Sequence, residues 1–144
     1  MSSSKRAFVF VAGLAVLAVS LAAQAQEKFK ARLYPVTLDA SLRAEITGNG
    51  SIAAVLEGRK LSITGSFDGL RTAATVAQIN QSPVTGVRGP SVLDLTISKA
   101  TSGSVTGSFE LTDQQVDMLR KGRLYVQIHS EKAPDGNLWG WLLR

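Results

Sequence analysis

The stretch RLYVQIHSEKAPDGNLWGWLL, residues 123–143, alternates apolar and polar side chains on both sides of a turn. In its first half, one side of the chain carries Leu124, Val126 and Ile128. A period of two is typical of strands with one buried face, and the Pro-Asp-Gly sequence at 134–136 favours a turn. The stretch therefore predicts a β-hairpin whose apolar side faces a core.

The same alternation recurs upstream, with turn-forming residues between the segments. It covers residues 28–33, 51–57, 61–67, 72–80, 92–98 and 104–111. Residues 81–90, rich in Pro and Gly, are predicted as a long loop. Thr112 and Gln115 have the spacing of a capping box, which predicts one short helix over about 112–121. About eight short strands and one helix indicate an all-β, antiparallel sandwich or barrel.

The N-terminus has the features of a signal peptide over residues 1–25. Lys5 and Arg6 precede an apolar run over residues 7–23, and Ala-Gln-Ala follows at 23–25. We expect cleavage after Ala25, which leaves residues 26–144 as one domain in the periplasm or outside the cell. An uncleaved anchor is the alternative, although the run falls short of the roughly 20 apolar residues of a spanning helix. No other run of that length follows, so we expect a soluble mature form.

Composition excludes several classes of chemistry. The chain has one histidine, His129, and no cysteine, which removes thiol nucleophiles and soft metal-ligand clusters. The formal charge of +5 includes Lys5 and Arg6. The other basic residues are scattered apart from one cluster, Arg120, Lys121 and Arg123, which we interpret as solvated charge at a helix end. Nucleic-acid binding needs a concentrated basic patch, so we expect no nucleic-acid partner. We also expect no catalytic residue, no cofactor and no bound metal.

One face of the C-terminal hairpin is a candidate binding surface. If Asn137 lies opposite His129, then Trp139 faces Gln127 and Trp141 faces Tyr125. We therefore expect Tyr125, Gln127, His129, Trp139 and Trp141 on one outer face. Large exposed aromatic side chains in one patch indicate a binding surface. Two alternatives are open: a loop or the N-terminal segment covers the tryptophans, or the parity inverts and they lie in the core.

Several short motifs occur in the order found in the CHRD domain, a module named from chordin that also occurs in bacterial exported proteins. The motifs are Gly69-Leu70, residues 72–80, Gly89-Pro90, Leu111-Thr112-x-x-Gln115-Val116-x-x-Leu119, Tyr125-Val-Gln-Ile-His129 and Pro134-x-Gly136. The chain resembles this family over roughly residues 29–143. The resemblance implies an immunoglobulin-like Greek-key β-barrel, similar in outline to copper/zinc superoxide dismutase. The family has no settled biochemical activity.

The chain departs from the family at one informative position. Family members usually show Ala-His-Ile-His where this chain has Ala77-Gln78-Ile79-Asn80. The resemblance implies that Gln78, Asn80 and His129 are the positions of a vestigial metal site and approach one another on the outer surface. Amides are poor ligands for copper and zinc, which favour imidazole and thiolate. We therefore expect no copper binding at these positions.

These observations favour an exported, non-enzymatic binding or structural β-domain that engages a protein partner in the cell envelope. One alternative is a copper-binding or dismutase-like redox protein, which the ligand count of one histidine and no cysteine disfavours. Another is an accessory subunit of an envelope complex, which an aromatic patch would suit. The sequence leaves the partner's identity and the oligomeric state open.

Overall fold

Alternating apolar residues produce the predicted strands throughout the part of the chain that the structure describes. The computed structural model describes residues 25–37 and 40–144, so the expected signal peptide lies outside the described residues apart from Ala25. The elements are β1 (Gln26–Pro35), the 3-10 helix η1 (Ala40–Leu42), β2 (Asn49–Glu57), β3 (Lys60–Asp68), β4 (Ala74–Gln81), β5 (Ser91–Ile97), β6 (Gly103–Glu110), α1 (Asp113–Arg120), β7 (Leu124–Ser130) and β8 (Leu138–Trp141).

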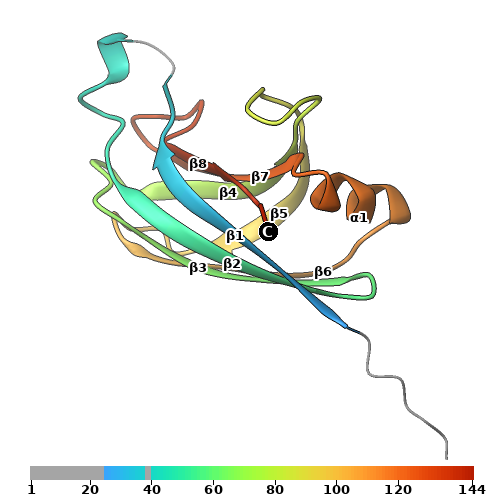
Figure 1. Cartoon of the computed structure of the whole chain (residues 1–144). Helices are drawn as coiled ribbons and strands as arrows, with labels where there is room; N and C mark the ends of the chain where they lie inside the picture. Colours follow the sequence, from blue (N-terminus) through green and yellow to red (C-terminus); the bar gives the residue numbers. More distant parts are fainter. Residues whose placement is uncertain (1–24, 38–39) are drawn as a thin grey trace, which may run out of the picture.

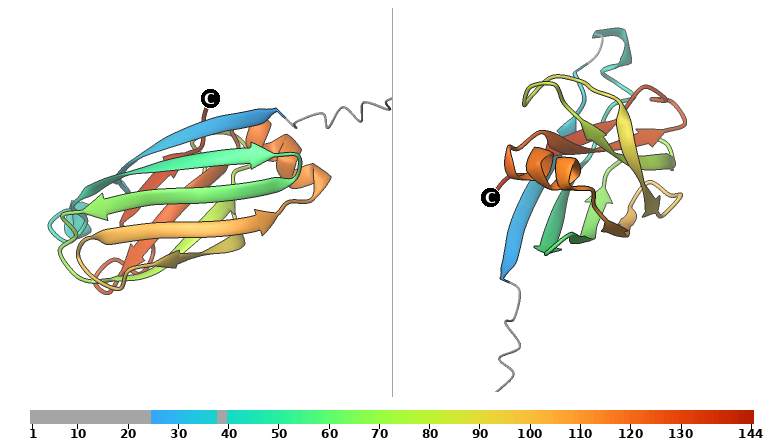
Figure 2. Two further views of the ribbon diagram at one scale, coloured as in Figure 1. Left: turned by 90° about the horizontal axis from the view of Figure 1, so that it is seen from below. Right: turned by 90° about the vertical axis from the view of Figure 1, so that its right-hand side faces the viewer.

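The eight described strands form a closed antiparallel barrel in the order β1-β2-β3-β6-β5-β4-β7-β8 (Figure 1). In Figure 2, left, β1, β2, β3 and β6 lie in front of β7 and β8. The β1 strand contributes to both sides: residues 26–33 pair with β2, whereas Tyr34 and Pro35 pair with β8 and close the barrel. The predicted all-β, antiparallel class with one short helix is confirmed.

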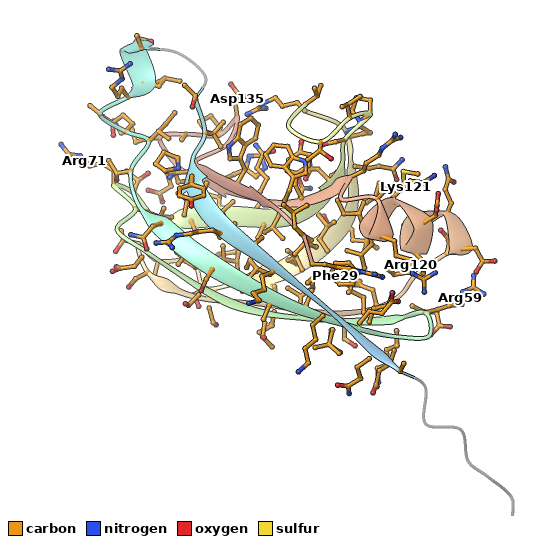
Figure 3. The ribbon with its side chains drawn as sticks, in the orientation of Figure 1. Phe29, Arg59, Arg71, Arg120, Lys121 and Asp135 are labelled. Atoms are coloured by element: carbon orange, nitrogen blue, oxygen red, sulfur yellow. The ribbon has the colours of Figure 1, made fainter. Side chains whose placement is uncertain are left out.

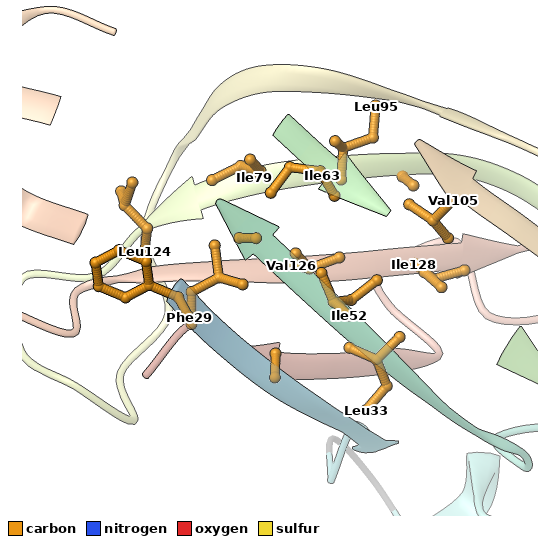
Figure 4. Close-up of a cluster of buried hydrophobic side chains, with 14 of the residues drawn as sticks. Phe29, Leu33, Ile52, Ile63, Ile79, Leu95, Val105, Leu124, Val126 and Ile128 are labelled. Carbon is orange, nitrogen blue, oxygen red and sulfur yellow. The ribbon is translucent and has the colours of Figure 1, made fainter. Parts of the chain in front are cut away.

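The core fills the barrel interior with the inward side chains of all eight strands. Leu124, Val126 and Ile128 are fully buried there, as the hairpin pattern predicts (Figure 4). They pack among Phe29, Leu33, Ile52, Ile63, Ile79, Leu95 and Val105. Each such side chain gains roughly 1.5–3 kcal/mol on leaving water, so the interior supplies the main drive for folding.

The helix α1 covers one end of the barrel (Figures 1 and 2). The predicted capping box is present: the Thr112 hydroxyl accepts from the Gln115 backbone N–H, and the Gln115 side chain accepts from the Thr112 N–H. Val116 and Leu119 are buried and join the core. No helix within residues 25–37 and 40–144 has the length and hydropathy that crossing a membrane requires.

An ion-pair network joins the start of β1 to the helix and to the C-terminal residue. Glu27 accepts from Arg120, whose Nη2 lies 2.8 Å from Oε2 and whose Nε lies 3.2 Å from both carboxylate oxygens, and it also pairs with Arg144. Arg120 extends from α1 at the end of the barrel (Figure 3). The hydrogen bonds from Arg120 hold the pKa of Glu27 below its ordinary value, although burial acts in the opposite direction.

This lowered pKa predicts a pH-dependent contribution to stability. A carboxyl whose pKa is lower in the folded state stabilises the fold above its unfolded pKa, about 4.3 for Glu, and that contribution is lost as pH falls through the folded value. We expect Glu27→Gln to lower the urea midpoint at pH 7 and to match the wild type near pH 2. Glu110→Gln, an exposed acid outside this network, is the control. An equal loss at both pH values would contradict the network's role.

Candidate functional site

The outer face of β7 and β8 carries the predicted residue set in the predicted register. Tyr125 lies opposite Trp141, and Gln127 lies opposite Trp139. The intervening residues, such as Val126 and Leu138, point into the core. The prediction that the aromatic side chains share the outer side of this hairpin is therefore confirmed, and the alternative of inverted parity is wrong.

Three aromatic rings pack together on this face. The rings of Tyr125 and Trp141 are stacked with centroids 4.8 Å apart, and those of Trp139 and Trp141 meet edge to face at 5.0 Å. Tyr125 and Trp139 also meet edge to face, at 6.2 Å. Offset stacking and edge-to-face geometries are the favourable arrangements for aromatic pairs. We call these three residues the aromatic cluster.

The loop 82–90, which joins β4 to β5, covers one end of the aromatic cluster. The Tyr125 hydroxyl accepts from the Gly89 N–H at 3.1 Å and donates to the Gly89 carbonyl at 3.2 Å. The Trp141 indole N–H donates to Ser82 Oγ at 2.9 Å. Asn80 donates to the Gly89 carbonyl at 3.1 Å. These bonds fix both ends of the loop over the sheet.

Two of the five predicted binding residues are consequently buried. Tyr125 is 0% exposed under the loop, and Gln127 is 2% exposed where its amide donates to the Asp135 carbonyl at 2.9 Å. These two side chains are therefore not accessible to a partner. The alternative that a loop covers the tryptophans holds only in part, because the loop bonds to Trp141 but both tryptophans remain partly exposed. Trp139, Trp141 and His129 are partly exposed, so the binding role stays a prediction for these three.

A groove beside the tryptophans remains open. It has a volume of about 320 Å³ and lies between β1, β8 and the tip of the loop. Its lining consists of Lys30, Arg32, Tyr34, Thr85, Gly86, Trp139, Gly140, Trp141 and Leu143. Tyr34 is 55% exposed and Leu143 is 47% exposed, which is unusual for large apolar side chains. We call this surface the aromatic groove.

The aromatic groove has a positive rim. The Arg32 guanidinium lies 6.0 Å from the centre of the Tyr34 ring, and that of Arg88 lies 5.6 Å from the Trp139 ring. Arg88 also donates to the Asp135 carbonyl at 2.7 Å. Within residues 25–37 and 40–144, no carboxylate lies within 4.0 Å of Lys30, Arg32 or Arg88. Their charges are therefore available to an anionic ligand.

The β1 residues of this groove were absent from the sequence-based site. Lys30, Arg32 and Tyr34 lie on the outward side of β1, because Phe29, Ala31 and Leu33 point inward. The alternation in residues 28–33 contains that signal. However, their position beside the tryptophans depends on the pairing of Tyr34 with Trp139, which follows from barrel closure rather than from local pattern.

The three expected metal-site positions share the outer face but do not converge. Gln78 lies opposite Gln127, and its amide donates to Asp94 Oδ1 at 3.2 Å. Asn80 lies opposite Tyr125, four residues along β7 from His129, which corresponds to about 14 Å in an extended strand. The expectation that Gln78, Asn80 and His129 approach one another is therefore wrong for Asn80.

His129 is held by the loop that follows its strand. Its Nδ1 lies 2.7 Å from the Pro134 carbonyl, which can only accept, so Nδ1 carries the proton. Its Nε2 is buried and has no hydrogen-bond partner among the described residues. The same is true of Asn80 Oδ1. Within residues 25–37 and 40–144, no three His, Cys, Asp or Glu side chains gather closely enough to hold a metal ion.

The two hydrogen bonds between the Tyr125 hydroxyl and Gly89 predict that the loop becomes looser when they are removed. Tyr125→Phe removes both bonds to Gly89, which should cost about 1 kcal/mol and loosen the loop 82–90. The chain has only two tryptophans, both in the aromatic cluster, so their fluorescence reports on this cover. We expect greater quenching by acrylamide in Tyr125→Phe than in the wild type. Tyr34→Phe, at the exposed tyrosine, is the control, and equal quenching in both variants would contradict the loop's anchoring.

The comparisons with known proteins match the whole barrel to one family. A family model described as the CHRD domain matches residues 29–142, from the first inward residue of β1 to the residue after β8. No curated protein matches the chain. No solved structure matches it. The match includes both tryptophans of the aromatic groove and all the described strands except the first three residues of β1. The chain therefore belongs to the CHRD domain family.

Proposed function

We propose that this chain is an exported, non-enzymatic binding module that engages a protein partner of the cell envelope through the aromatic groove. The observation that carries the proposal is the groove itself, where Trp139 and Trp141 remain partly exposed beside Tyr34. Trp, Tyr and Arg are the residues that most often dominate binding energy at protein interfaces. All three types line this one surface.

The chemistry of the lining supports binding rather than catalysis. The described residues that form the groove include no carboxylate, imidazole or thiol. General acid-base catalysis needs a group that exchanges a proton near neutral pH, and His129 is bound to Pro134 outside the lining. The groove instead offers apolar ring surfaces and fixed positive charges, which hold a ligand without transforming it.

Barrel closure supports recognition by side chains. Each described strand has a neighbour on both sides, so a partner peptide has no long free edge to extend. The strand order also supports the proposed Greek-key, dismutase-like type of barrel: β4, β5 and β6 follow one another, and β7 returns beside β4. A partner would therefore contact an outer face of the barrel.

Export is part of the proposal, and N-terminal sequencing tests it. The basic and apolar leader and the Ala-Gln-Ala sequence at 23–25 support cleavage after Ala25. Such cleavage would leave Gln26, the first residue of β1, as the new N-terminus. We expect protein recovered from the periplasm or the medium of the native host to begin at Gln26. A full-length, membrane-embedded main species would overturn this part of the proposal.

The binding role predicts a partner whose capture depends on the groove. The domain 26–144 serves as bait in envelope extracts of the native host, alongside Tyr34→Ala and Val76→Ala. Tyr34 lines the groove, whereas Val76 is an exposed apolar residue of β4 outside it. We expect the wild type and Val76→Ala to retain the same protein, and Tyr34→Ala to lose at least three-quarters of it. Matching urea midpoints exclude misfolding, and equal capture by all three baits would contradict the proposed site.

A further inference from the structure

We propose that the partner presents an extended acidic peptide segment, which places an apolar side chain in the aromatic groove and carboxylates on its positive rim. This inference rests on the proposed function and specifies the chemistry of the partner. It is carried by charge complementarity: Lys30 and Arg32 line the groove, and Arg88 lies over the ring of Trp139 beside it. No carboxylate of the described residues lies within 4.0 Å of these three side chains.

The spacing of the rim fits an extended chain. Lys30 and Arg32 both point outward from β1 and are two residues apart, which corresponds to about 7 Å. Side chains at positions i and i+2 of an extended peptide have the same separation and the same direction. Two acidic residues at alternate positions can therefore meet both cations, while Arg88 lies across Trp139 on the loop side.

The hydrogen-bonding state of the groove favours a peptide over an acidic sugar. The Thr85 hydroxyl donates to the Gly122 carbonyl at 2.8 Å, and the Trp141 indole N–H donates to Ser82. Two of the four neutral side-chain donors of the lining, those of Thr85 and Trp141, are therefore used internally. A bound sugar would need partners for its many hydroxyl groups, because burying a polar group without a hydrogen bond is costly. An aliphatic or aromatic side chain needs none, and the exposed Leu143 and Tyr34 offer it apolar contact.

The size of the groove sets the length of the segment. A volume of about 320 Å³ lies at the lower end of the range of about 300–1,000 Å³ for ligand pockets. This space suits a few side chains of an extended segment. The contact area is correspondingly small, so we expect weak, salt-sensitive binding by a short isolated peptide.

A capped peptide of the sequence Glu-Ser-Glu-Ser-Leu, in which both carboxylates and the leucine share one face of an extended chain, is the probe. The fluorescence of the two tryptophans of the domain 26–144 is the readout. We expect a saturable change with this peptide. The dissociation constant should be at least tenfold larger for the peptide with Gln in place of Glu. The peptide with Lys in place of Glu should give no response. The double variant Lys30→Gln with Arg32→Gln should bind at least fivefold more weakly. Lys28→Gln, on the same face of β1 but outside the groove, is the matched control.

The outcomes separate this inference from the proposed function. Equal binding of the Glu and Gln peptides, or no response to either, would overturn the inference that the partner presents an acidic segment. Tighter binding of oligogalacturonate than of the Glu peptide would show that the ligand is an acidic sugar and would also overturn it. In each case, capture of an envelope protein that is lost in Tyr34→Ala would leave the binding role intact.

Discussion

The enclosed core and the aromatic groove both depend on two residue pairs between β1 and β8. Tyr34 pairs with Trp139 and Pro35 with Leu138, and this short contact closes the barrel. A separate bridge between Lys30 and Leu143 supports it, with hydrogen bonds of 2.7 and 2.9 Å. Closure has two consequences: it encloses the core, and it brings the basic side of β1 against the tryptophans of β8. The aromatic groove exists only because the barrel is closed at this seam.

The sequence predicts the strands and their faces well because side-chain direction depends only on local backbone geometry. Alternation placed Leu124 and Val126 inside and Tyr125 outside. The observed register, with Trp139 opposite Gln127, is the one expected if Asn137 lies opposite His129. What alternation does not reveal is whether an outward residue meets water. Tyr125 points away from the core and is nevertheless 0% exposed, because the loop 82–90 bonds to its hydroxyl through Gly89. A loop's path depends on tertiary contacts, which residue period does not encode.

The metal-site positions show a second limit of alternation, which is that it does not determine how far apart two residues lie along the strands. Parity assigned Gln78, Asn80 and His129 to one outer face, and the register agrees with that assignment. Parity does not give the distance between these residues, and the pairing of β4 with β7 places Asn80 opposite Tyr125 rather than near His129. There its amide donates to the Gly89 carbonyl and helps to hold the loop. In this chain, the asparagine at that position therefore contributes to covering the aromatic cluster.

The loop 82–90 connects the buried and the open parts of the outer face. Its ends bond to Tyr125 and Trp141 through Gly89 and Ser82, whereas Thr85 and Gly86 at its tip form one wall of the groove. Thr85 is itself fixed to Gly122, the residue that follows α1 and its C-cap. The wall is thus held at three points before any ligand arrives. A site whose walls are already ordered loses less conformational entropy on binding, and this compensates in part for the small area that the groove offers.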